Sequence, residues 1–289
     1  MKKSVSKLRL GKPGKSQKKV VTRRSLAKAP KAAKAVAAQK VSGSRKKAQT
    51  AVKKAPLILP PEITNDRRIL VIDIGGSNVK LMLADQPRKK FNSRPALTPR
   101  RLVSAVLSET KGWKFDAISI GFPAPVEGGK ILHEPHNLGK GWMRFNLENA
   151  LGKPVKIIND AAMQAMGSYA GGRMLFLGLG TGLGSALVHN GTLIPLELCE
   201  ARFSKQLSLE DVLGKRGCKR TGLVKWEQGL KEIIGLLRRM FMVDYIVLGG
   251  GNVKKLGKLP EGTRPGNNNN AFAGGVRMWS AEIEAVNKG

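Results

Sequence analysis

The chain has 289 residues, of which 41% are hydrophobic, and a formal net charge of +32, so it can hold one large domain or two smaller ones. Two cysteines, Cys199 and Cys218, are too few for a disulfide framework or, by themselves, for a zinc site. No apolar run approaches the roughly 18–20 residues of a membrane span or follows the N-terminal charges as in a secretory signal, which favours a cytoplasmic protein without a membrane partner.

Residues 1–60 are predicted to form a basic tail and linker. Residues 1–55 contain 19 Lys and Arg and no Asp or Glu, which leaves 33 basic and 20 acidic residues for the rest of the chain. We expect this segment to be disordered, because it has no aromatic residue and buries too little apolar surface to offset the entropy of ordering. Such a tail can bind nucleic acid or polyphosphate, or it can be a solubilising extension without a dedicated partner.

Two strand–turn–strand units are the clearest local pattern. A β-branched apolar run at 68–74 and an extended stretch at 79–84 flank the turn Gly75-Gly76-Ser77-Asn78. The same arrangement returns at 174–188, around the glycine-rich stretch 178–184. This repetition predicts an internal duplication into two similar lobes, at residues 61–165 and 166–289.

The remaining elements alternate in type along the chain. We expect helices at 99–109 and 223–241, a further helix that starts just after Asn159-Asp160, and strands at 117–120, 155–158 and 245–248. The last of these strands ends in Gly249-Gly250-Gly251. Strands that alternate with helices indicate an α/β architecture.

The glycine turns are candidate phosphate-binding sites, because glycine lets backbone N–H groups approach a phosphate without an intervening Cβ. Two such turns that face each other across a cleft could hold the phosphates of a nucleotide. The chain contains no G-x-x-x-x-G-K-[ST] sequence, and the run 180–184 does not fit G-x-G-x-x-G and precedes an apolar strand rather than a helix.

Four motifs resemble those of the ROK family of sugar kinases, within the actin-like ATPase superfamily, and they occur in the family's order over residues 68–285. They are the first phosphate motif (73–77), the catalytic motif Asn159-Asp160-Ala161, the second phosphate motif (180–184) and the adenosine-side turn (249–251). Ser77 and the stretch 137–142 are similar to the polyphosphate glucokinase branch. The resemblance implies the actin-like (ribonuclease H-like) α/β fold, with two similar lobes and a central cleft.

The resemblance also implies the chemistry, which is transfer of a terminal phosphate from ATP or polyphosphate to a hexose, with the glucose 6-hydroxyl as the best candidate. It assigns Asp160 as the general base, although Asn159-Asp160 could instead simply cap the following helix. It assigns Asp73 to position Mg²⁺ through water, although the turn's own backbone could satisfy this carboxylate instead. The implied phosphate- and nucleotide-binding residues are Asp73, Gly75, Gly76, Ser77, Gly180, Thr181, Gly182, Gly184, Gly249, Gly250 and Gly251.

The residues that the resemblance implies for sugar binding are Asn137, Asn159, Glu197 and Glu200, together with Asp160. Glu200 stands where the family usually has a histidine, and a carboxylate can accept from a sugar hydroxyl but cannot donate to it. This difference puts the identity of the sugar in question. The cysteine-rich zinc motif of many members is missing, since Cys218 alone cannot supply it, and a homodimer remains open.

A second hypothesis is a sugar-sensing ROK regulator that contacts DNA through its tail. Residues 1–55 lack the apolar pattern of the helix-turn-helix domain that such regulators carry, and the presence of Asp160 favours kinase chemistry. A third hypothesis is an active kinase that its tail tethers to nucleic acid or polyphosphate. His133 and His136 have the i, i+3 spacing of a metal pair, but the intervening Pro135 predicts a loop, and Trp142 is expected in the core rather than against the sugar.

Overall fold

The computed structural model describes residues 67–93, 96–267 and 269–280, and all of them belong to the unit Lys54–Gly289. The predicted tail at residues 1–60 lies outside the described residues. None of the described helices combines the length and the apolar character that a membrane span requires.

The first sheet has five strands, which lie in the order β3 (Lys89–Asn92), β2 (Asn78–Met82), β1 (Ile69–Ile74), β4 (Ala117–Phe122) and β7 (Val155–Asn159). The first three strands along the chain form an antiparallel meander, and β4 and β7 continue the sheet parallel to β1. Every residue of β1 and of β4 is buried. Strands covered on both faces are typically continuous apolar runs, which explains the β-branched sequence at 69–74.

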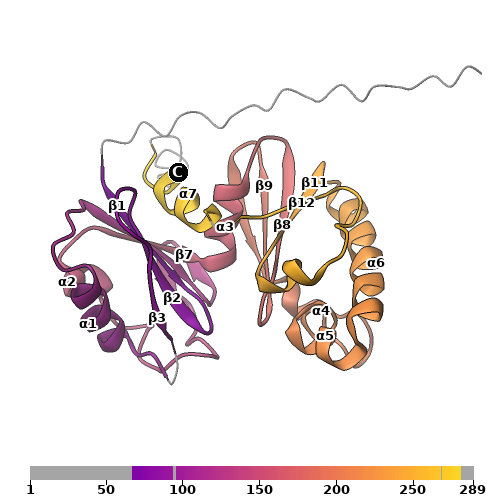
Figure 1. Ribbon diagram of the computed structural model, residues 1–289, viewed down its shortest axis with the longest axis horizontal. Helices are drawn as coiled ribbons and strands as arrows, with labels where there is room; N and C mark the ends of the chain where they lie inside the picture. Colours follow the sequence, from indigo (N-terminus) through magenta and orange to yellow (C-terminus); the bar gives the residue numbers. More distant parts are fainter. Residues whose placement is uncertain (1–66, 94–95, 268, 281–289) are drawn as a thin grey trace, which may run out of the picture. The chain divides into compact units, whose positions relative to one another are not determined.

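The second sheet repeats this topology, in the order β10 (Thr192–Leu196), β9 (Leu183–His189), β8 (Arg173–Leu179), β11 (Tyr245–Gly249) and β12 (Thr263–Pro265). Again an antiparallel meander is followed by two parallel strands. The two sheets therefore match strand for strand, and the predicted α/β fold with two similar lobes is confirmed. Figure 1 shows both sheets, one with β1, β2, β3 and β7 and the other with β8, β9, β11 and β12. A separate small hairpin is formed by β5 (Val126–Glu127) and β6 (Lys130–Ile131).

Each sheet packs against helices from its own half of the chain. The first core contains residues of α1 (Pro99–Glu109) and α2 (Leu147–Leu151), and the second contains residues of α4 (Leu209–Leu213), α5 (Lys215–Thr221) and α6 (Leu223–Phe241). Two short 3₁₀ helices, η1 (Leu198–Glu200) and η2 (Gly251–Lys255), lie in the second half of the chain. The predicted helices at 99–109 and 223–241 are confirmed, and the first begins with Thr98 as N-cap and Pro99 in its first turn.

Two helices connect the halves of the molecule. A Cβ atom on Gly167 of α3 (Asp160–Ser168) would overlap the carbonyl oxygen of Asn270 in α7 (Asn270–Arg277), and one on Gly274 would overlap that of Met163. The missing side chains thus allow the two backbones to touch where α3 and α7 cross (Figure 1). Beyond the crossing, α7 packs on the first sheet, where the Ser119 hydroxyl donates to the Gly275 carbonyl at 2.6 Å. The predicted lobe boundary between residues 165 and 166 falls within α3.

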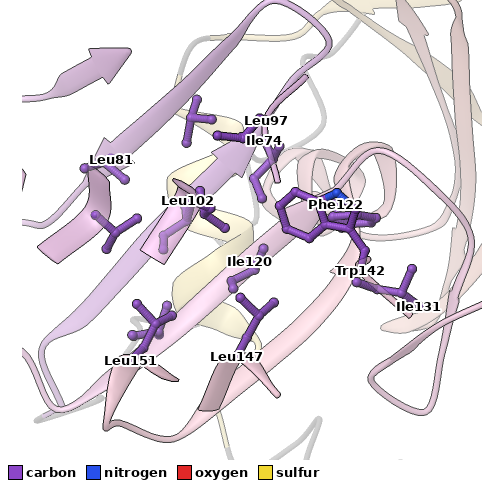
Figure 2. Close-up of a cluster of buried hydrophobic side chains, with 14 of the residues drawn as sticks. Ile74, Leu81, Leu97, Leu102, Ile120, Phe122, Ile131, Trp142, Leu147 and Leu151 are labelled. Atoms are coloured by element: carbon purple, nitrogen blue, oxygen red, sulfur yellow. The ribbon is translucent and has the colours of Figure 1, made fainter. Parts of the chain in front are cut away.

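The extended stretch expected at 79–84 ends earlier, at Met82, because a turn follows in which the Gln86 N–H donates to the Leu83 carbonyl. Trp142 is buried in the first core, with its ring centroid 4.9 Å from that of Phe122 (Figure 2), which confirms the packing interpretation. His133 and His136 lie in a loop, as expected.

Candidate active site

Asp73 and Asp160 come together at one edge of the first sheet. Asp73 is the last residue but one of β1, is 3% exposed, and pairs with Gly121 of the parallel strand β4. Asp160 is the first residue of α3, directly after β7, and a Cβ atom on Gly121 would lie 3.3 Å from its Cα atom. The glycine therefore makes room for the start of α3. Because parallel strands end at the same edge, side chains from β1 and from the end of β7 meet there.

The surroundings of Asp160 shift its proton affinity. The pKa of its carboxyl group is raised to about 7, mainly by burial and also by the charges of Asp73 and Glu197, while the Ala161 N–H and the charge of Lys80 lower it. The Ala161 N–H donates to Asp160 Oδ1 at 2.8 Å. A carboxylate with a pKa close to the working pH has the property that a general base needs.

Lys80 is a residue of this site that the sequence interpretation missed. Its ammonium Nζ lies 2.7 Å from Asp73 Oδ2, and its charge also acts on Asp160. The hairpin register places Lys80 directly opposite Asp73. That register follows from the predicted turn at 75–78, so counting outward from the turn would have found this pair in the sequence.

Asn159, and not Asp160, is the N-cap of α3. The Asn159 Oδ1 accepts from the N–H groups of Ala161 and Ala162, at 2.9 and 3.1 Å, and thus caps α3. Its amide nitrogen lies 3.4 Å from the Ala124 carbonyl. Asn159 therefore caps the helix and Asp160 does not. The Asn159 amide group has at most one N–H left to donate to a sugar.

The first glycine turn lies beside Asn137, a candidate sugar-binding residue. The Gly75 N–H donates to the Asn78 carbonyl at 2.9 Å and closes the turn. A Cβ atom on Gly76 would lie 3.9 Å from the Asn137 side chain, so the turn and Asn137 are neighbours. Ser77 is exposed, and its carbonyl accepts from the Ser93 N–H.

The second and third glycine turns pack on each other. A Cβ atom on Gly250, where φ is +84°, would lie 2.6 Å from the Leu179 carbonyl, and the Asn252 amide donates to the Gly180 carbonyl at 2.9 Å. The Gly180 N–H is used within its own turn, toward the carbonyl oxygens of Gly178 and Gly182. Thr181 is exposed at the tip, and Gly249 and Gly251 flank Gly250.

The second hairpin also touches the start of α3. A Cβ atom on Gly184 would lie 2.7 Å from the Cβ of Ala161, the residue that follows Asp160. The structure therefore places the second hairpin next to the candidate base through a contact that a larger residue at position 184 would prevent.

Three carboxylates gather around Cys199. Its thiol donates to Glu197 Oε2 at 3.3 Å, and its pKa is raised to about 12 by burial and by Glu197, Glu200 and Glu210. Of the three, Glu197 also acts on Asp160. Glu210 was not predicted. Its Oε2 accepts from the Leu183 N–H at 3.3 Å, and only the packing of α4 against the second turn reveals this contact.

The loop that carries Asn137 is fastened by another acidic residue that the sequence interpretation missed. The Glu134 carboxylate accepts from three consecutive backbone N–H groups, those of Gly141, Trp142 and Met143, at 3.0, 3.2 and 3.4 Å. The Gly139 N–H donates to the Leu97 carbonyl at 2.9 Å, ahead of α1. Such a nest of N–H groups is a good site for a negative charge, and this one fixes the loop beside the first glycine turn.

The ROK family model matches residues 69–195. Polyphosphate glucokinase of Mycobacterium tuberculosis is 25% identical over 229 residues, which are 68% of this chain and 83% of the relative. This agreement confirms the resemblance to the ROK kinases and to their polyphosphate glucokinase branch.

Solved structures support the same fold. The inorganic polyphosphate/ATP-glucomannokinase of Arthrobacter sp. strain KM is 24% identical with a TM-score of 0.64, covering 76% of this chain and all of that chain. The ROK glucokinase of Streptomyces griseus, solved with glucose and AMPPNP, is 16% identical with a TM-score of 0.57, covering 73% and 98% of the two chains.

A metal ion at this site would have few protein ligands. Among the residues that the structure describes, no group of three or more His, Cys, Asp and Glu side chains could hold a metal ion. Mg²⁺ usually keeps several waters and takes only one or two protein carboxylates together with substrate phosphates. Asp73, with Asp160 nearby, fits a site in which Mg²⁺ has only one or two protein carboxylates. One carboxylate oxygen of Asp73 is paired with the Lys80 ammonium group.

Proposed function

We propose that this chain is a glucokinase-type phosphotransferase that transfers a terminal phosphate from polyphosphate or ATP to a hexose, with the 6-hydroxyl of glucose as the preferred acceptor. The observation that carries the proposal is Asp160, a carboxyl group with a pKa of about 7 at the sheet edge where β1, β7 and the second hairpin meet. Phosphoryl transfer needs a positioned nucleophile and charge neutralisation, and little other covalent chemistry.

On the acceptor side, Asp160 takes the proton of the sugar hydroxyl as the phosphoryl group arrives. Its raised pKa lets it receive a proton near neutral pH, where an ordinary aspartate is too weak a base. The other sugar hydroxyls find their donors and acceptors in Asn137, in the remaining N–H of Asn159 and in the carboxylates of Glu197 and Glu200.

On the donor side, the phosphates are held by the N–H groups around Gly76 and by those around Gly182, other than the Gly180 and Leu183 N–H groups, which already have acceptors. The turn at 249–251 lies on the adenosine side when the donor is ATP. The Lys80 ammonium lies where it can stabilise negative charge on the transferred group. Asp73 would hold Mg²⁺ through water, and this ion would neutralise charge on the donor phosphates.

A substrate panel tests the proposal. The full-length protein should form a sugar phosphate from glucose with ATP or with polyphosphate, each supplied separately with Mg²⁺ and measured by detection of the product. Absence of product with every hexose and both donors would refute the kinase. Glucose binding without turnover, measured by calorimetry, would then favour a sugar-sensing protein.

A further inference from the structure

A basic hollow, called the groove below, is lined by residues of α6 and of the segment that precedes β12. It has a volume of about 580 Å³ and lies between the middle of α6 and the segment that leads into β12. Lys231 and Arg238 line it from the helix, and Lys258 and Glu261 line it from the segment. The uncharged residues that complete the lining are Ile234, Gly235, Leu259 and Pro260. A smaller hollow of about 270 Å³ shares Arg238 and adds Arg239.

The guanidinium group of Arg238 is the central feature of this groove. It lies close to Gly262, where a Cβ atom would overlap it, and its Nε atom is buried without a hydrogen-bond partner among the described residues. None of the lysines and arginines of the groove forms an ion pair with a residue that the structure describes. A buried donor without a partner costs free energy, so a ligand that supplies an acceptor would be favoured here.

The helix dipole does not account for this arrangement by itself. Arg238 and Arg239 lie in the last turn of α6, where cations are favourable. However, Lys258 comes from a different segment, and it faces the same hollow as Lys231 and Arg238. Three cations around a hollow with one acidic group, Glu261, favour an anionic ligand. An arginine fork together with lysine ammonium groups is the arrangement that binds phosphate most effectively.

The groove is distinct from the glycine turns. The Gly262 carbonyl next to it accepts from the Ile246 N–H at the start of β11, whereas the turn at 249–251 follows the end of the same strand. We infer that the groove around Arg238 is an accessory binding site for a phosphate group of a phosphate chain, separate from the site of phosphoryl transfer. This inference does not depend on which hexose, if any, the protein phosphorylates.

Inorganic triphosphate is a suitable probe, used with the full-length protein. We expect titration to shift the Nε–H resonance of one arginine in ¹⁵N-detected spectra, and this resonance should be missing from Arg238→Gln. In calorimetry, Arg238→Gln/Lys258→Gln should lower the affinity for triphosphate about tenfold. The matched control, Arg100→Gln/Lys111→Gln, removes two exposed cations from the first lobe and should lower it less than twofold.

The comparison separates a site from a general effect of charge. Residues 1–55 and the glycine turns are the same in both double variants, so any binding of triphosphate there cancels. An unmoved Arg238 resonance, or equal losses of affinity in the two double variants, would overturn the inference. Equal melting temperatures of the wild type and of the two double variants would show that the groove variant, Arg238→Gln/Lys258→Gln, is folded.

Discussion

Replacement of Asp160 by Asn tests both the catalytic role of this residue and the cost of burying its charge. The amide keeps the shape of the side chain and can still accept from the Ala161 N–H, but it cannot take up a proton. General-base catalysis contributes about 10²–10⁴-fold, so turnover should fall by this factor while sugar binding persists. In the wild type, kcat should rise with pH and reach half its maximum near pH 7, the pKa of the carboxyl group.

The same variant should be more stable than the wild type at neutral pH. The pKa of Asp160 is raised from 3.8 to about 7, so the folded protein binds more protons than the unfolded chain between these values, and wild-type stability falls as pH rises through this window. Asn does not titrate. The advantage of the variant should therefore grow by about 1.4 kcal/mol per pH unit and level off above pH 7, at no more than about 4 kcal/mol.

Urea unfolding between pH 5 and pH 8, together with turnover at each pH, measures both effects. Asp85→Asn is the control, because Asp85 is an exposed carboxylate paired with Arg68 at the surface. A difference in the free energy of unfolding between Asp160→Asn and the wild type that does not change with pH would show that the pKa of the Asp160 carboxyl group is not raised in the folded protein. Turnover within tenfold of the wild type would remove Asp160 from the role of general base.

Three further changes test other parts of the structure. Glu134→Gln removes the charge from three hydrogen bonds, and hydrogen bonds to a charged group are worth about 1.5–3 kcal/mol, so the KM for sugar in steady-state kinetics should rise about 10- to 100-fold. The exposed control Glu127→Gln should leave this KM unchanged, and an unchanged KM for Glu134→Gln would show that the loop does not contribute to sugar binding. Gly274→Ala should lower the free energy of unfolding by about 3 kcal/mol or more, because the new methyl group overlaps the backbone of α3. The control Gly229→Ala in α6 has room for the methyl group and should raise the free energy of unfolding by up to about 1 kcal/mol. Similar urea midpoints for the two variants would contradict this account of the helix crossing. Deletion of residues 1–55, which carry 19 basic side chains, should weaken retention on long polyphosphate at low salt. The melting temperature and the ATP-dependent turnover should stay nearly unchanged. A large drop in melting temperature would show that this segment is part of the fold.

Local patterns determined most of the elements. The apolar run at 69–74, the glycine turns and the 3.6-residue periodicity at 223–241 fix structure within short stretches, so their helices and strands were predicted within a few residues. The duplication was also visible, since each lobe opens with its own hairpin. The pairing of Lys80 with Asp73 belongs to the same class, because it follows from the register around one turn.

Contacts between distant segments were beyond the reach of these patterns. The groups around Asp160 come from β1, from β2 and from the start of η1, and its pKa depends on how these segments pack. Glu134 and Glu210 accept from backbone N–H groups whose direction is set only when loops and helices dock. The crossing of α3 and α7 depends on glycines more than a hundred residues apart. The sequence by itself thus determined the elements and the motifs, because these depend on neighbouring residues, whereas burial, charge environment and close approach depend on the tertiary structure.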